Sequence, residues 1–156
     1  PAGVKRKLIG VNQKNLAQLL EEVLRKQGSE HVMLVHSEDG MDEISLAAPT
    51  FVAELKDGTI HEHTIQPEDF GINRNAASLE GGDASANAAI MQSILKGDAS
   101  PYRDVVILNA AAGLVAAGEF SDFKNAAKAA AESIDSGAAA KKLKSLIEFS
   151  QELINK

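Results

Sequence analysis

The most constraining feature of this chain is a change of pattern at residues 66–82, where strand-like segments give way to helix-like ones. Before this stretch, short apolar runs alternate with turn residues, which is typical of strands. After it, apolar residues recur every three or four positions, which is typical of amphipathic helices. The stretch itself contains Pro67, Gly71, Gly81 and Gly82, and we expect it to be a long connection. The pattern predicts an α/β fold with a sheet-rich first part and a helical second part.

Five strands and one helix are expected before this connection. Asn12 or Asn15 is expected to cap the helix and Gly28 to end it, and Asp57-Gly58 is expected to form a tight hairpin turn. The β-α-β order followed by hairpins predicts a mostly parallel sheet with an antiparallel edge. The expected strands cover residues 4–11, 31–36, 43–47, 51–55 and 59–65, and the helix covers residues 15–27.

The second part is expected to contain helices only. Asp83 is a favourable N-cap, and Pro101 occupies a first turn, where proline is tolerated. We therefore expect one α/β unit over residues 1–156, rich in strand over 1–66 and helical over 83–156. The expected helices cover residues 83–96, 101–117, 121–135 and 138–154.

Charge and composition argue against several classes of protein. The formal net charge of −6 disfavours nucleic acid as a partner, because binding to a phosphate backbone needs a basic surface. No run of about 18 apolar residues occurs, so we expect no membrane partner. The chain has no cysteine, which excludes disulfides and zinc–thiolate sites and fits a reducing cytoplasm, our expected location.

The strongest candidate site is the stretch 38–46, Glu-Asp-Gly-Met-Asp-Glu-Ile-Ser-Leu, which follows the apolar strand 31–36. Asp42 and Glu43 are adjacent carboxylates in a glycine-containing turn. Mg²⁺ prefers carboxylate oxygens and is usually completed by water and the phosphates of a substrate. The pair therefore indicates a magnesium site, and the alternative is a solvated turn without a ligand.

Other candidates are weaker. Residues 81–83, Gly-Gly-Asp, precede a helix and could bind an anion, but the carboxylate favours a capping role. His61 and His63 share one strand face without a third metal ligand nearby in the sequence. His36 lies at the carboxyl end of a strand, where α/β folds place ligands, and Ser45 has no identifiable base. The chain contains neither a P-loop nor a dinucleotide-binding glycine motif.

Several segments occur in an order and spacing that together resemble one family. They are Pro1-Ala2-Gly3-Val4, Leu8-Ile9-Gly10-Val11, His36 with Asp39-Gly40-Met41-Asp42-Glu43-Ile44-Ser45, Pro67-Glu68-Asp69-Phe70-Gly71, Gly81-Gly82-Asp83-Ala84 with Asn87-Ala88, and Asn109-Ala110-Ala111. The chain resembles anthranilate phosphoribosyltransferase over essentially its whole length.

The resemblance implies a specific chemistry. The family transfers the phosphoribosyl group of phosphoribosyl pyrophosphate (PRPP) to anthranilate and releases pyrophosphate, in tryptophan biosynthesis. By this resemblance Asp42 and Glu43 match the acidic pair that binds Mg²⁺, with Glu43 near the pyrophosphate. The resemblance also implies a homodimer for the full-length enzyme.

The departures from the family are equally informative. Family members are about twice this length, and their glycine-rich pyrophosphate loop and most of their helical domain are not found in these residues. We therefore expect a carboxy-terminal fragment that is inactive alone, with an exposed sheet edge and an uncovered apolar face. The alternatives are a non-catalytic paralogue and a free-standing interaction module with the same half-fold.

Overall fold

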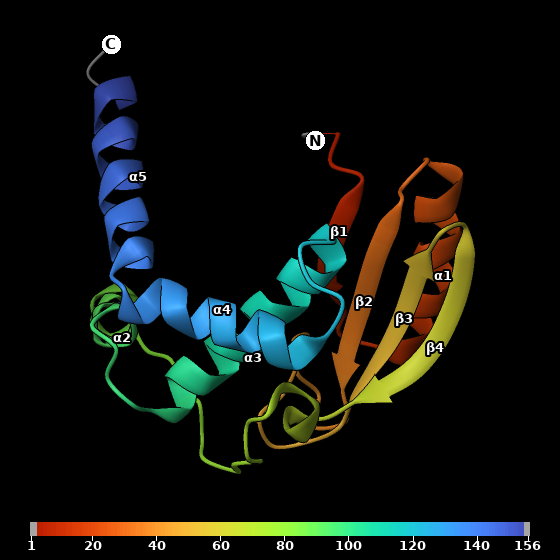
Figure 1. The fold of residues 1–156 in the computed structure, drawn as a ribbon, viewed down its shortest axis with the longest axis horizontal. Coiled ribbons are helices and arrows are strands. Elements are labelled where there is room, and N and C mark those ends of the chain that lie inside the picture. The colour runs from red at the N-terminus through yellow and green to blue at the C-terminus, as the bar shows by residue number, and fades with distance from the viewer. Residues whose placement is uncertain (1–2, 155–156) are drawn as a thin grey trace.

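The computed structural model describes residues 3–154, which form one mixed sheet and five α-helices (Figure 1). Helix α1 lies against one face of the sheet, and α3 lies against the other with α4 packed beside it. The expected α/β class and helical second part are confirmed. In chain order the elements are β1 (Arg6–Gly10), α1 (Lys14–Lys26), β2 (His31–Ser37), β3 (Thr50–Lys56), β4 (Thr59–Ile65), the 3-10 helix η1 (Pro67–Phe70), α2 (Ala84–Leu95), α3 (Pro101–Ala117), α4 (Phe123–Asp135) and α5 (Ala138–Ile154).

The sheet has the order β1-β2-β3-β4, and its strand pairing corrects one expectation. Within the described residues only β1 and β2 are parallel, whereas β2 with β3 and β3 with β4 are antiparallel. The sheet is therefore not mostly parallel over this stretch. The reason is the connections: α1 provides a crossover between β1 and β2, but no helix separates the later strands. The hairpin turn is confirmed, because Asp57 and Gly58 both have positive φ angles, 51° and 77°.

The strand expected over residues 43–47 is wrong. This segment runs as an irregular loop, although Ile44 and Leu46 are buried in the core as strand residues would be. Side chains satisfy its backbone in place of a neighbouring strand: the N–H of Ile44 donates to Asn109 Oδ1 at 2.9 Å, and that of Ser45 donates to Thr50 Oγ1 at 3.2 Å. An alternating apolar pattern alone could not distinguish this arrangement from a strand.

Strand β2 is the centre of the molecule and divides the apolar core in two. Met33 and Val35 belong to the cluster beneath α3, and Val32 and Leu34 belong to the cluster beneath α1. All four side chains are at most 1% exposed. Because β2 is paired on both sides and covered on both faces, the turn at its carboxyl end, residues 38–46, starts from the most firmly held strand.

The helical part follows its sequence signals closely. Helices α2, α3 and α4 begin after Asp83, Ser100 and Asp122, and each of these side chains accepts a hydrogen bond from a backbone N–H of the first turn. Helix α1 differs, because Gln13 rather than an asparagine occupies its N-cap position and makes no side-chain cap. Within the connection 66–82, the short helix η1 was not expected.

Helix α5 extends away from the rest of the molecule and contacts α4 at its base (Figure 1). None of its described residues is buried. The uncovered apolar face expected on the sheet is not found among the described residues, because the strands carry no large exposed apolar side chain. Half of the large exposed apolar side chains lie on α5. As expected, both sheet edges, β1 and β4, have one neighbour only within the described chain. No helix in residues 3–154 is long and apolar enough to cross a membrane.

Candidate functional site

The acidic turn is a compact loop at the carboxyl end of β2. The N–H of Ser37 donates to the carbonyl of Met41 at 2.9 Å, and the N–H of Gly40 donates to the carbonyl of Ser37 at 2.9 Å. Gly40 has a φ angle of 92°, a conformation that glycine adopts without strain. These bonds reverse the chain so that residues 42 and 43 follow directly beside the strand end.

Asp42 and Glu43 are both exposed, and neither carboxylate makes a hydrogen bond or ion pair with another residue in 3–154. Their oxygens are therefore not needed to hold the turn together. No group of three or more histidines, aspartates or glutamates in the described residues could by itself hold a metal ion. Two free carboxylates nevertheless fit Mg²⁺, which is usually bound through one or two protein carboxylates with water and substrate phosphates as the remaining ligands.

The backbone of this acidic pair, unlike its side chains, is held from outside the turn. The Asp42 carbonyl lies against Gly10, at the end of β1, so closely that any Cβ at position 10 would overlap it. On the other side, the Asn109 amide on α3 both accepts from the Ile44 N–H and donates to the Ile44 carbonyl, at 2.9 and 3.0 Å. Gly10 and Asn109 belong to segments that resemble the family, but the sequence did not predict that they hold the backbone of the acidic pair.

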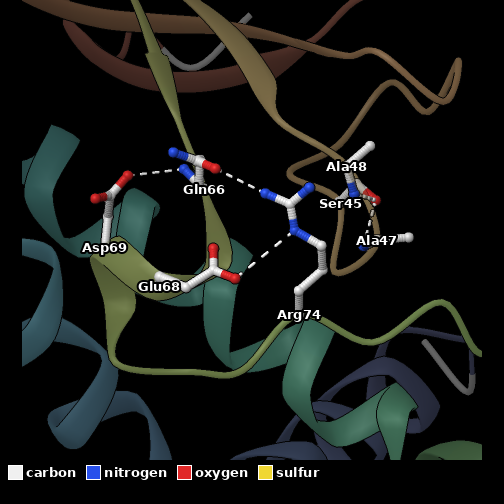
Figure 2. A network of polar contacts seen from close by, with 7 residues as sticks. All are labelled: Ser45, Ala47, Ala48, Gln66, Glu68, Asp69 and Arg74. Carbon is white, nitrogen blue, oxygen red and sulfur yellow. Dashed lines mark hydrogen bonds and ion pairs between the residues drawn. The ribbon is translucent and has the colours of Figure 1, made fainter.

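Ser45 has a structural role in the turn. Its hydroxyl donates to Asp39 Oδ2 at 2.5 Å. The same oxygen accepts from the N–H groups of Ala47 and Ala48 at 2.9 and 3.2 Å (Figure 2). The side chain is only 1% exposed, and its bonds leave no role as a nucleophile. Burial raises the pKa of Asp39, but hydrogen bonds from Ser45, Ser37 and backbone N–H groups outweigh this, and the net pKa lies below the usual value.

A second polar network faces the Ser45 loop. Arg74 donates to Gln66 Oε1 at 2.7 Å and lies 3.7 Å from Glu68 Oε1, while Asp69 accepts from the Gln66 N–H (Figure 2). The N–H of Asn75 donates to the Leu46 carbonyl at 2.9 Å and joins the two loops. The long connection 66–82 therefore contacts the acidic turn through Asn75. The glycine and proline content of the connection did not indicate this contact.

The weaker candidates are placed as follows. Nδ1 of His36 donates to the Val11 carbonyl at 3.0 Å and so ties the end of β2 to the chain after β1. His61 and His63 lie on β4 and gain no third metal ligand among the described residues. Asp83 caps α2 as favoured, accepting from the Ala86 N–H at 2.8 Å. The Gly81-Gly82 turn is clamped by Asn87, whose amide bonds both the N–H and the carbonyl of Gly82 at 2.9 Å.

Two hollows lie at different ends of β2, and only one of them is beside the acidic turn. A cleft of about 770 Å³ lies at the amino end of β2, lined by residues that include Arg6, His31 and Lys56. It is at the wrong end of the parallel strands, because ligands of α/β folds bind at their carboxyl ends. Beside the acidic turn lies a hollow of only about 150 Å³, whose lining includes Asp39, Ser45, Asn75, Ala77 and Leu79. This hollow is smaller than the roughly 300–1,000 Å³ of a usual ligand pocket.

Comparison with known proteins identifies the family. A model described as the glycosyl transferase family, a/b domain, matches residues 1–140. The chain belongs to this glycosyl transferase family. The carboxyl-end turn with its free acidic pair is thus part of the family's a/b domain.

Relatives within the glycosyl transferase family confirm the resemblance seen in the sequence. Anthranilate phosphoribosyltransferase of Rhodopseudomonas palustris (strain BisA53) is 54% identical over 151 residues, which is 96% of this chain and 44% of that protein. The corresponding enzyme of Bradyrhizobium diazoefficiens is 48% identical over 96% of this chain and 45% of its own length. The chain therefore spans less than half the length of these relatives.

Solved structures agree with this membership. Anthranilate phosphoribosyltransferase from Thermus thermophilus superposes with a TM-score of 0.85 at 33% identity, over 96% of this chain and 44% of that one. The enzyme from Saccharomyces cerevisiae in complex with PRPP and Mg superposes with a TM-score of 0.75 at 25% identity, over 88% of this chain and 40% of that one.

Proposed function

We propose that this chain is the a/b-domain portion of an anthranilate phosphoribosyltransferase, in which Asp42 and Glu43 hold Mg²⁺ against the pyrophosphate of PRPP. The observation that carries the proposal is the exposed acidic pair at the carboxyl end of β2, whose carboxylates have no other partner in residues 3–154. A turn that used its acids for structure would engage them, as Asp39 is engaged by Ser45. The yeast relative in complex with PRPP and Mg supports the choice of ligand.

In the proposed reaction, the anthranilate nitrogen forms a bond to the anomeric carbon as the bond from that carbon to pyrophosphate breaks, and the amine releases one proton to water. Mg²⁺, when bound, supplies positive charge that stabilises the leaving pyrophosphate. Asp42 and Glu43 hold the ion from the protein side, and their exposure leaves its opposite side open to phosphate oxygens. An aromatic amine is uncharged at neutral pH, so orientation of the reactants is expected to matter more than a strong base.

The described residues supply one wall of this site, because the hollow beside the turn is too small to enclose PRPP. We therefore expect the 156-residue chain alone to show no turnover of PRPP and anthranilate. Turnover by the purified chain would contradict this expectation. Anthranilate binding, a homodimer and a cytoplasmic location follow from the family as further parts of the proposal.

Metal binding can be tested on the chain itself. We would titrate Mn²⁺, a paramagnetic substitute for Mg²⁺, into the isotope-labelled chain with and without PRPP and follow the broadening of backbone amide signals. Signals of residues 41–44 should broaden first, and PRPP should lower the Mn²⁺ concentration that is needed. The double variant Asp42→Asn, Glu43→Gln should lose this selective broadening while its thermal unfolding stays unchanged, since both side chains are exposed.

The matched control removes two negative charges at the other end of the sheet. Asp57→Asn with Glu119→Gln changes the net charge equally, and both side chains are exposed beside the cleft at the amino end of β2. This variant should bind Mn²⁺ as the unmodified chain does. Broadening that is uniform over all surface acids, or that is equal in both double variants, would refute the metal role of the acidic pair.

A further inference from the structure

Asn109 is a half-buried polar residue on the side of α3 that faces the core. Its neighbours one turn away and beside it, Val105, Leu108 and Ala112, are all buried in the core. Asparagine is a poor residue for a helix interior, and an amide removed from water is costly unless it is hydrogen-bonded. A specific set of bonds is therefore needed to explain the residue at this position.

The Asn109 amide makes three hydrogen bonds. Oδ1 accepts from the Ile44 N–H at 2.9 Å, while Nδ2 donates to the Ile44 carbonyl and to the Val105 carbonyl, both at 3.0 Å. These use three of the four hydrogen bonds that an asparagine side chain readily makes. One of the three stays within α3, and the other two replace the neighbouring strand that the Ile44 backbone lacks.

Two contacts together fix the backbone on both sides of Glu43. The Ile44 N–H belongs to the peptide group that joins Glu43 to Ile44, and Asn109 holds it. The Asp42 carbonyl belongs to the peptide group that joins Asp42 to Glu43, and it lies against Gly10. Because peptide groups are planar, holding both of them sets the φ and ψ angles of Glu43, and with them the direction in which its side chain leaves the turn.

We propose that Asn109 is a positioning residue for the metal-binding pair, acting through the Glu43–Ile44 peptide group. The proposal rests on the metal role of Asp42 and Glu43 proposed above. An ion held by two protein carboxylates needs both in one orientation, and their side chains have no other support in residues 3–154. Residues that orient metal ligands typically change metal affinity by about 10- to 100-fold when replaced, and we expect a loss of at least about 10-fold here.

The first test compares two asparagines that make the same kind of clamp. Asn109→Ala should weaken Mn²⁺ binding to residues 41–44, measured by NMR titration with PRPP present, by at least about 10-fold. Asn87→Ala removes the same pair of backbone bonds from the Gly82 turn and should leave Mn²⁺ affinity unchanged. Urea unfolding of both variants separates lost affinity from lost stability. Asn109→Leu, which fills similar space without hydrogen bonds, should also lose affinity.

The second test needs no variant and therefore does not depend on how well the substitutions fold. If the clamp and the ion are coupled, linkage requires that Mg²⁺ stabilise the clamp by the same factor by which an open clamp weakens Mg²⁺ binding. Saturating Mg²⁺ with PRPP should therefore slow hydrogen exchange at the Ile44 amide by at least about 10-fold. Exchange at the Gly82 amide, which Asn87 holds, should not change.

The outcomes separate this inference from the function on which it rests. Failure of the unmodified chain to bind Mn²⁺ at residues 41–44 would overturn the proposed function. Selective binding that is equal in the unmodified chain and in Asn109→Ala, together with unchanged Ile44 exchange, would overturn the role of Asn109 and leave the function standing.

Discussion

Gly10 and Asp42 meet backbone to backbone, with the Asp42 carbonyl occupying the space that a side chain at position 10 would need. The contact joins the end of β1 to the acidic turn that follows β2. Because these two strands are parallel neighbours, their carboxyl ends lie at the same edge of the sheet. Because Gly10 has no Cβ atom, the acidic turn can pack directly against the end of β1.

Gly10→Ala is therefore expected to be destabilising. The new methyl group must displace the acidic turn or β1, and overpacking of this kind costs about 1–3 kcal/mol of unfolding free energy. Urea denaturation measures the loss. Gly113→Ala on α3 is the matched control: nothing lies within 4 Å of its Cβ position, and alanine should stabilise the helix by about 0.5–1 kcal/mol. An unchanged stability in Gly10→Ala would show that the turn moves freely.

Ser45→Ala should lower stability by about 1–3 kcal/mol, because it leaves the N–H groups of Ala47 and Ala48 without this acceptor and removes one of the hydrogen bonds to the partly buried Asp39 carboxylate. The effect should depend on pH. The pKa of Asp39 is lowered in the folded chain, so its stabilising contribution is present above about pH 4 and is lost as the pH falls through the folded pKa. The difference between Ser45→Ala and the unmodified chain should accordingly shrink in acid, as measured by urea denaturation from neutral pH down to about pH 3. A difference that is independent of pH would mean that the Asp39 bond contributes nothing.

Glu21→Gln is expected to raise stability at neutral pH. Glu21 is 5% exposed on α1, its Oε2 atom has no partner within residues 3–154, and burial followed by the charges of Glu62 and Glu22 raises its pKa. A raised pKa means that the folded state binds the proton more tightly, so stability decreases as the pH rises from about 4.3 through the folded pKa. The melting temperature of Glu21→Gln at neutral pH should rise by about 2–4 °C, as relief of an unpartnered buried charge worth about 1 kcal/mol would give.

The advantage of Glu21→Gln should disappear near about pH 4, where the carboxyl group of Glu21 is protonated. Glu22→Gln is the adjacent comparison: it removes only the smallest of the three causes that raise the pKa of Glu21 and breaks a 2.9 Å surface ion pair with Arg25 that is worth little, so its effect on the melting temperature should be smaller. A lower melting temperature for Glu21→Gln at neutral pH would show that the buried carboxylate is stabilising.

Helix α5 should bind a hydrophobic dye. Its exposed apolar side chains include Leu146, Phe149 and Leu153, which are 57–61% exposed. Leu146→Lys with Leu153→Lys should lower dye fluorescence without a change of more than about 0.5 kcal/mol in unfolding free energy, because exposed residues contribute little to stability. Ser145→Lys with Gln151→Lys adds the same charge to the helix and should leave the fluorescence nearly unchanged. Equal fluorescence in both variants would place the dye elsewhere.

Local signals in the sequence predicted most of the helices and strands. The cap Asp83 and the first-turn proline Pro101 act within a few residues of the helices they start, and the Asp57-Gly58 turn specifies its hairpin by backbone conformation alone. The acidic pair was found for the same reason, since its chemistry is local. Its metal role stays a prediction.

The features that sequence reasoning missed depend on distant residues. The segment 43–47 has the apolar pattern of a strand but takes its hydrogen bonds from Asn109 and Thr50, and no local pattern reveals such partners. The proportion of parallel strands depends on which strands become neighbours. One signal was present and could have been used: Asn109 is a lone amide on the apolar side of a helix, which predicts a specific buried partner.

The bond between Ile44 and Asn109 joins residues 65 positions apart in the chain. The strands β2, β3 and β4 are close in sequence and can pair early, whereas this contact requires the third helix to have docked on the sheet. The acidic turn therefore reaches its final geometry only once α3 has docked on the sheet. Competence to bind a divalent ion would then report that both halves of the domain have assembled, not merely that the sheet has formed.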